Sequence, residues 1–239
     1  MIINSIKTEI ITSKSIGMDE FLDKYVPVME EDSILIISSK VVSLIEGRTV
    51  SPSTNKLQLI KTESDLISKE PNRYDHHIVI KHNAFISGAG LDQSNGGGTF
   101  VLLPEHPYEI AEYIHTYIAS KFNLSNFGVI ITDSRSQPLR RGALGVAISF
   151  WGFAPLNNYV GKKDIFGRVF NFEQLNVVDS LAIAANVVMG EGSEQTPLAV
   201  IKEVDSVEFN KLSPTKRELK EFLLTLEEDF FHPFYKDVF

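Results

Sequence analysis

The sequence predicts a mixed α/β fold, α/β or α+β, and three observations support that class. Short apolar runs rich in β-branched residues recur along the 239 residues, helical patterns lie between them, and no internal repeat or long linker separates them. The length fits a single domain over residues 1–239, built from two intimately joined lobes with mixed sheets and flanking helices. We interpret the apolar runs as largely buried strands, and they cover residues 33–39, 77–82, 127–133, 143–150 and 197–202.

Three helical patterns complete this prediction. A first helix opens at His106-Pro107, because proline is favoured in the first turn of a helix. A second covers residues 175–189 and ends at Gly190, and a third covers residues 213–230 as a surface helix docked on the core. The apolar positions that share a face are Ile110, Ile114, Tyr117 and Ile118 in the first helix, and Val178, Leu181, Ala185 and Val188 in the second.

Composition excludes several classes of protein. Hydrophobic residues make up 43% and charged residues 23%, which is ordinary for a globular domain, and the net charge of −8 argues against non-specific nucleic-acid binding. The absence of cysteine excludes disulfides, thiolate zinc sites and cysteine nucleophiles. No apolar run is long enough for a membrane span and no signal-peptide pattern begins the chain, so we expect a soluble, cytoplasmic protein with no membrane partner.

The glycine-rich stretch GAGLDQSNGGG, residues 88–98, is the most unusual segment. Glycine permits positive φ and close backbone approach, which serve a tight turn, a flexible linker and a ligand loop equally well. Neither standard glycine-rich phosphate motif is present. Asp92 and Asn95 between the glycines are compatible with all three roles.

A second candidate segment is VIITDSRSQPLRRG, residues 129–142. A buried strand runs directly into Asp133 and Ser134, and ligands of α/β proteins gather at the carboxyl ends of strands. The carboxylate and hydroxyl suit Mg²⁺ or Mn²⁺, and Arg135, Arg140 and Arg141 suit a phosphate or carboxylate. Taken alone, the segment is more typical of a simple Asp-Ser turn with solvated arginines.

Other polar segments carry weaker signals. Glu191 lies just past a predicted helix C-terminus, where the helix dipole disfavours a carboxylate unless a cation or solvent compensates. The six histidines show no zinc-binding spacing, and His115 on the first predicted helix is expected to be structural or exposed rather than catalytic. No nucleophile-elbow motif is present, so an α/β-hydrolase is excluded.

Taken together and in this order, six segments resemble the gamma-glutamyl ligases of the deazaflavin coenzyme F-420 pathway. The resemblance extends over roughly residues 10–203, and the joint spacing is specific although each motif alone is weak. The segments are SSKVVSLIEGR, GAGLDQSN, LLPEHP, VIITDSRSQPLRRG, VGKKDIFGR and DSLAIAANVVMGEG.

This resemblance implies a GTP-dependent ligase that uses Mg²⁺ or Mn²⁺, with a monovalent cation as a further ion. The partners implied are L-glutamate and a small-molecule acceptor with an anionic tail, handled by a homodimer of two-lobed subunits. The acceptor carboxylate would attack the γ-phosphate of GTP to give an acyl phosphate, from which the glutamate amine displaces phosphate. The residues would orient two anions and neutralise charge, and no enzyme nucleophile is needed.

The resemblance also implies roles for individual residues. The Asp-Thr pair of the family falls on Asp133 and Ser134, and an N-terminal nucleotide segment with thin similarity falls on residues 11–14. The metal ligands would be Asp92, Asp133, Ser134 and Glu191, and the nucleotide contacts Ser39, Lys40, Asn95, Met189, Gly190, Glu191, Gly192, Ser193 and Thr196. The catalytic candidates are Asp92 and Asp133, with Arg140 and Arg141, or Lys162, Lys163 or Arg168, to hold the acceptor or the phosphates.

At two positions this sequence lacks a cationic side chain of the family pattern. The glycine-arginine after the Asp-Thr pair is Ser136-Gln137 here, with Arg135 just before it, and a lysine of the first motif is Leu44. These changes point to an altered acceptor pocket. The deazaflavin acceptor, coenzyme F-420-0, is slightly favoured over folate, whose glutamate tail the same chemistry would extend. The sequence is also compatible with a non-catalytic nucleotide-binding protein on the same fold, and with a plain α/β protein whose glycine-rich stretch is a turn.

Overall fold

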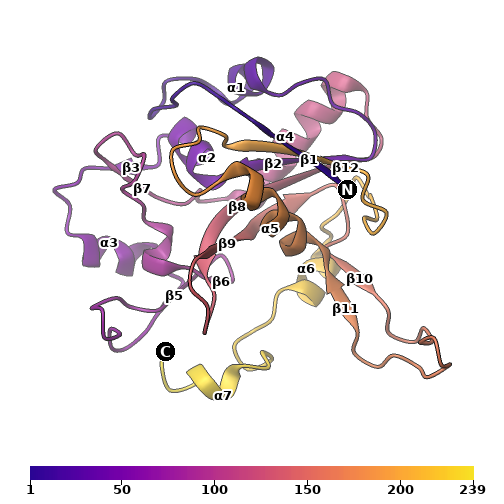
Figure 1. The fold of residues 1–239 in the computed structure, drawn as a ribbon. Helices are drawn as coiled ribbons and strands as arrows, with labels where there is room; N and C mark the ends of the chain where they lie inside the picture. The colour runs from indigo at the N-terminus through magenta and orange to yellow at the C-terminus, as the bar shows by residue number, and fades with distance from the viewer.

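The computed structural model, which describes residues 1–239, is built on a five-stranded mixed sheet with strand order β1-β12-β2-β8-β9 (Figure 1). β2 and β8 are parallel, whereas the other neighbouring pairs are antiparallel. The strands are β1 (Ile2–Ile6), β2 (Ser33–Ser38), β8 (Phe127–Ser136), β9 (Ala143–Trp151) and β12 (Leu198–Lys202). The mixed α/β class is therefore confirmed, and four of the five predicted strands lie in this sheet.

The central strands β2, β8 and β12 are buried on both faces, which explains why they are continuous apolar runs, whereas the edge strand β1 is mostly exposed. In β2, Leu35 and Ile37 face one core cluster while Ile34 and Ile36 face the other. Helices α1 (Met18–Tyr25), α2 (Ser39–Glu46) and α4 (Pro107–Phe122) cover the first face. Helix α5 (Val177–Met189) covers the second, with α6 (Lys216–Phe222) beside it.

Helix α4 begins at Pro107 as predicted, and α5 ends before Gly190 as predicted but begins at Val177 rather than at residue 175, because residues 174–176 form a strand. In α4, Ile114 and Ile118 are fully buried, and in α5 the buried side chains include Val178, Leu181 and Ala185. Val188 is 37% exposed because Met189 takes the buried position in the last turn, so its place on the stripe was wrong. Asparagine or glycine at positive φ closes each helix, with φ of 55° at Asn123 and 78° at Gly190.

The predicted helix over residues 213–230 is wrong in its length. Only α6 is helical there, and Leu223 already has extended dihedral angles. Thr215 and Glu218 form a reciprocal capping box, and Phe222 packs edge-on against Phe150 of the core. Beyond this anchor the chain turns, and it becomes helical again only in α7 (His232–Tyr235).

The remaining elements surround the sheet as small units. The predicted strand at 77–82 becomes β5 (Val79–Lys81), which lies between β4 (Leu66–Ile67) and β6 (Ala84–Phe85), and β3 (Thr49–Val50) pairs with β7 (Phe100–Val101). Helix α3 (Lys56–Glu63) lies on the same side (Figure 1). The pair β10 (Leu156–Asn158) and β11 (Gln174–Asn176) forms an arm that extends away from the sheet (Figure 1). No helix has both the length and the apolar character needed to cross a membrane.

Candidate active site

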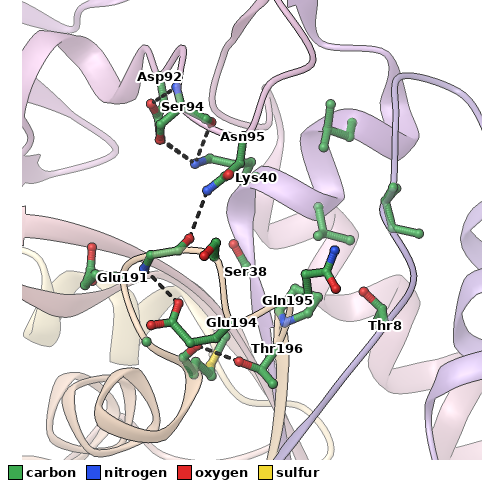
Figure 2. Close-up of a pocket in the computed structure, with 18 of the residues that line it drawn as sticks. Thr8, Ser38, Lys40, Asp92, Ser94, Asn95, Glu191, Glu194, Gln195 and Thr196 are labelled. Carbon is green, nitrogen blue, oxygen red and sulfur yellow. Dashed lines mark hydrogen bonds and ion pairs between the residues drawn. The ribbon is translucent and has the colours of Figure 1, made fainter.

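A cavity of about 490 Å³ lies at the carboxyl ends of the parallel strands β2 and β8. Four segments form its walls: the start of α2, the glycine-rich loop, the loop that follows α5, and residues 8–11 near the N-terminus. Figure 2 shows Asp92, Ser94 and Lys40 on one side and Glu191 and Thr196 on the other. The parallel pair therefore places these loops at the position where α/β folds usually bind ligands.

The first wall is the N-terminus of α2. Strand β2 leads directly into this helix, and its N-cap residue Ser38 makes no side-chain capping hydrogen bond. The amide groups of the first turn have no partner within the helix, and together with the helix dipole they favour an anion. Ser38 and Lys40 line the cavity, whereas Ser39, predicted to contact the nucleotide, is buried and does not line it. This wall is suited to a phosphate group.

The second wall is the glycine-rich loop, and it is an ordered turn rather than a linker. Residues Gly88, Ala89 and Gly90 all have positive φ, and a Cβ atom on Gly90 would lie 2.4 Å from the Leu103 side chain. The backbone of Asp92 then pairs with Val101 in both directions, at 3.0 and 2.8 Å. The glycines thus hold Asp92 at the cavity wall.

Asp92 lies in a network of charge-assisted hydrogen bonds. The Lys40 ammonium donates to its carboxylate, and Ser94 donates through its backbone amide at 2.7 Å and its hydroxyl at 2.9 Å (Figure 2). Burial alone would raise the pKa of Asp92, but the bonds from Lys40 and Ser94 outweigh burial and lower it. Asp92 is therefore held as a carboxylate.

Asp133 lies in the opposite electrostatic environment. It follows the buried part of β8, and burial raises the pKa of its carboxyl group to about 6 from 3.8. The nearby Asp92 charge acts in the same direction, while the Ser134 amide, the Ser39 hydroxyl and the Lys40 ammonium act against it. A cation beside Asp133 would relieve this penalty, because it stabilises the ionised form.

The third wall, residues 189–197, carries Glu191. Its carboxylate accepts a 2.6 Å hydrogen bond from the Asn186 amide on α5, which holds it just beyond the helix end. The Thr196 hydroxyl donates to the Met189 carbonyl at 2.6 Å, and the Asn95 amide donates to the Gly192 carbonyl at 3.0 Å. The last of these bonds links the glycine-rich loop to the third wall across the cavity.

The structure therefore brings Asp92, Asp133 and Glu191 to one cavity from separate parts of the chain. They do not form a compact cluster, because no three acidic or histidine side chains are arranged to hold a metal ion. Lys40 pairs with Asp92 and Asn186 with Glu191. The three carboxylates and the Ser134 hydroxyl are hard oxygen donors, and this chemistry fits Mg²⁺ or Mn²⁺.

The remaining predicted residues divide into two groups. Ser134, Asn95 and the residues from Met189 to Thr196 line the cavity, as does Ile11 of the thinly similar N-terminal segment. The cationic candidates for the acceptor do not line it. Arg140 and Arg141 lie exposed in the β8–β9 hairpin loop, and the exposed residues Lys162, Lys163 and Arg168 lie in the arm between β10 and β11.

Sequence reasoning missed several residues of the cavity. Asn186 was hidden within an apolar helix, and its only signal is that it precedes Gly190 by four residues, one helical turn. Ser94 lies within a motif that was noticed, but its two bonds to Asp92 could not be read from spacing. His115, in contrast, is structural as expected: it is buried and bonded to the Phe127 carbonyl at 3.1 Å.

Comparison with known proteins identifies the family. A sequence profile described as F420-0:gamma-glutamyl ligase matches residues 6–203. The chain is 34% identical over 206 residues to the coenzyme F420:L-glutamate ligase of Methanocaldococcus jannaschii, covering 79% of this chain and 82% of that protein. It is 33% identical over 229 residues to the protein of the same name from Methanococcus maripaludis strain C7, covering 89% of each. The chain therefore belongs to the F420-0:gamma-glutamyl ligase family.

Proposed function

We propose that the protein is a coenzyme F420:L-glutamate ligase, which joins the amine of L-glutamate to the terminal carboxylate of F420-0 and hydrolyses GTP to do so. One observation carries the proposal. Three carboxylates from distant segments, Asp92, Asp133 and Glu191, surround a cavity that also receives the N-terminus of a helix. Such a site attracts divalent cations and phosphates together, because each neutralises the charge of the other.

Each wall of the cavity has a function in this proposal. The free amides of α2 and the backbone of the glycine-rich loop would bind the phosphates, with Lys40 and Asn95 beside them. Asp92, Asp133, Ser134 and Glu191 would hold the divalent cations. Bound cations would neutralise the triphosphate and favour in-line attack on its γ-phosphate. Residues 189–196 would lie along the nucleotide.

The protein itself contributes position and electrostatics. A carboxylate is a poor electrophile, so the acceptor must first become an acyl phosphate before the glutamate amine can form the amide bond. The carboxylate attacks the γ-phosphorus and GDP leaves. The neutral amine then attacks the acyl carbon, phosphate leaves with the two bonding electrons, and the departing phosphate takes up the amine proton. The main task of the site is to orient the acceptor carboxylate and glutamate, which are both anions, relative to the anionic triphosphate.

The finer architecture also belongs to this proposal. We infer a homodimer of two-lobed subunits, in which residues 1–239 act as one ligase domain. The arm between β10 and β11 supports association, because Ile165, Phe166 and Phe172 are 92%, 89% and 86% exposed. Several large apolar side chains exposed on one arm are typical of a contact site. Light scattering that returned the mass of a monomer would contradict the dimer.

A direct assay tests the activity. The purified protein is incubated with GTP, L-glutamate, Mg²⁺ or Mn²⁺ and F420-0, and the products are weighed by mass spectrometry and assayed for GDP. We expect a product heavier by one glutamyl residue or more, with one GDP for each amide formed. A parallel reaction with a folate acceptor measures selectivity. GDP release that stays at the background rate when F420-0 is added would overturn the proposal.

A further inference from the structure

One arginine close to the cavity has no partner anywhere in the protein. The seven arginines include only two that are partly buried, Arg48 and Arg135. Arg48 pairs with Glu63 at 2.7 Å and donates to the Leu103 carbonyl at 3.2 Å. Arg135 makes no side-chain hydrogen bond or ion pair, and its Nε atom is buried without an acceptor. A buried guanidinium nitrogen without an acceptor is unfavourable, so this side chain is suited to an anion from outside the protein.

The position of Arg135 relates it directly to the reacting groups. In β8, Asp133 lies opposite Val146 of β9 and Arg135 lies opposite Leu144, with regular pairing between them. Side chains two residues apart on a strand share a face, so Arg135 follows Asp133 along the same face at about 7 Å. That distance is within reach of an extended arginine side chain. Arg135 is not among the residues that line the nucleotide cavity, and it therefore lies next to the cavity rather than in it.

The chemistry of the reaction determines which anion belongs there. The acceptor must present a carboxylate to the γ-phosphate, and so the acceptor has to approach from beside the nucleotide. Asp133 and Ser134 line the cavity at the end of β8, and Arg135 is the next side chain after Asp133 on the same face toward the hairpin loop. The exposed Arg140 and Arg141 lie further on, in that loop. A planar guanidinium can bind a carboxylate through two parallel hydrogen bonds and fix its orientation.

We propose that Arg135 is the residue that binds and orients the terminal carboxylate of the acceptor beside the γ-phosphate. This inference rests on the proposed ligase function and adds a specificity-determining residue to it. Arg135 could alternatively bind glutamate or the nucleotide phosphates, and each of these alternatives predicts a different kinetic effect of replacing Arg135. Arg135 would also hold the carboxylate while the acyl phosphate forms, without itself exchanging a proton or a bond.

Two variants and two acceptors test the assignment. Arg135→Met removes the charge at similar side-chain length. Arg135→Lys keeps the charge but loses the planar group that donates two parallel hydrogen bonds. The acceptors are F420-0 and F420-0 whose terminal carboxylate has been converted to a carboxamide, and binding is measured by equilibrium dialysis. We expect Arg135→Met to bind F420-0 about 10- to 100-fold more weakly than the wild type, because a charge-assisted hydrogen bond is lost. The carboxamide should bind the wild type and Arg135→Met equally weakly. The affinity of Arg135→Lys for F420-0 should lie between those of the wild type and Arg135→Met.

Steady-state kinetics separates binding of the acceptor from binding of glutamate or the nucleotide. We expect the KM for F420-0 to rise about 10- to 100-fold in Arg135→Met, and the GTP dissociation constant and the KM for glutamate to stay within about twofold. Arg217→Met is the matched control, because Arg217 is exposed on α6 and pairs only with Glu221. Unchanged F420-0 binding in Arg135→Met, or a raised KM for glutamate instead, would overturn the inference. A wild-type protein that makes no product would instead overturn the proposed function, and with it the reason for this assignment.

Discussion

Replacing Asp133 by asparagine is expected to stabilise the folded protein while it abolishes activity. Burial raises the pKa of the Asp133 carboxyl to about 6 from its ordinary value of 3.8. Asparagine has nearly the same shape, keeps an oxygen that can accept the 2.7 Å hydrogen bond from the Ser134 amide, and carries no charge. The variant therefore loses the desolvation penalty together with a proposed metal ligand.

The sign of the pH dependence follows from the raised pKa. Below pH 3.8 the carboxyl is protonated in both states and contributes no penalty; as the pH rises toward 6, the folded state holds the proton more tightly and loses stability. Each pKa unit corresponds to about 1.4 kcal/mol, so a rise of about two units corresponds to about 3 kcal/mol. Because the side chain is partly open to the cavity, solvent screening reduces this to about 1–3 kcal/mol.

Urea unfolding measures this difference, with the fluorescence of the single tryptophan, Trp151, as the signal and a chelator present throughout. At about pH 7.5 we expect the free energy of unfolding of Asp133→Asn to exceed that of the wild type by about 1–3 kcal/mol, and at about pH 4 we expect the difference to approach zero. The same variant should give no amide product. A difference that is constant with pH, or a variant less stable at the higher pH, would refute the reasoning.

Three single contacts give further predictions. Lys40→Met removes the cation that pairs with Asp92, so calorimetry should show weaker GTP binding by about tenfold; unchanged affinity would contradict the contact with phosphates. Burial lowers the pKa of His115, so wild-type stability should fall as the pH drops below about 6.5, and His115→Gln should lose that acid sensitivity in urea titrations. Leu35→Ala opens a cavity at a fully buried position and should cost about 2–5 kcal/mol in the same titrations, whereas a cost below about 1 kcal/mol would mean that the core relaxes around it.

The regular elements could be predicted because their signals are local. The central strands of the main sheet are buried on both faces and therefore appear as apolar runs, and α4 and α5 end at residues with positive φ. Strand β1 at the edge of the sheet is mostly exposed and was not predicted. The C-terminal helix was predicted too long because its apolar spacing continues past Phe222. Phe222 is the side chain that packs against Phe150, and a contact between residues this far apart leaves no trace in local spacing.

The candidate site divides in the same way. Asp92, Asp133 and Glu191 could be named from motifs, but the partners that control their charge, Lys40 for Asp92 and Asn186 for Glu191, come from other segments. The cationic residues predicted to bind the acceptor show most clearly what the sequence cannot predict. Three arginines within residues 135–141 are equivalent in sequence, and only the strand pairing separates a partly buried side chain from two exposed ones.

The sequence by itself determined the mixed α/β class, the family resemblance and the acidic residues of the site, because hydrophobic periodicity and motif spacing are properties of the chain alone. Only the tertiary structure decided that the parallel pairing of β2 and β8 brings three separate loops to one edge of the sheet. It also decided that burial favours the protonated form of Asp133, while Lys40 and Ser94 stabilise Asp92 as a carboxylate. Burial and charge pairing depend on groups distant along the chain, and distance in space is what a linear sequence does not contain.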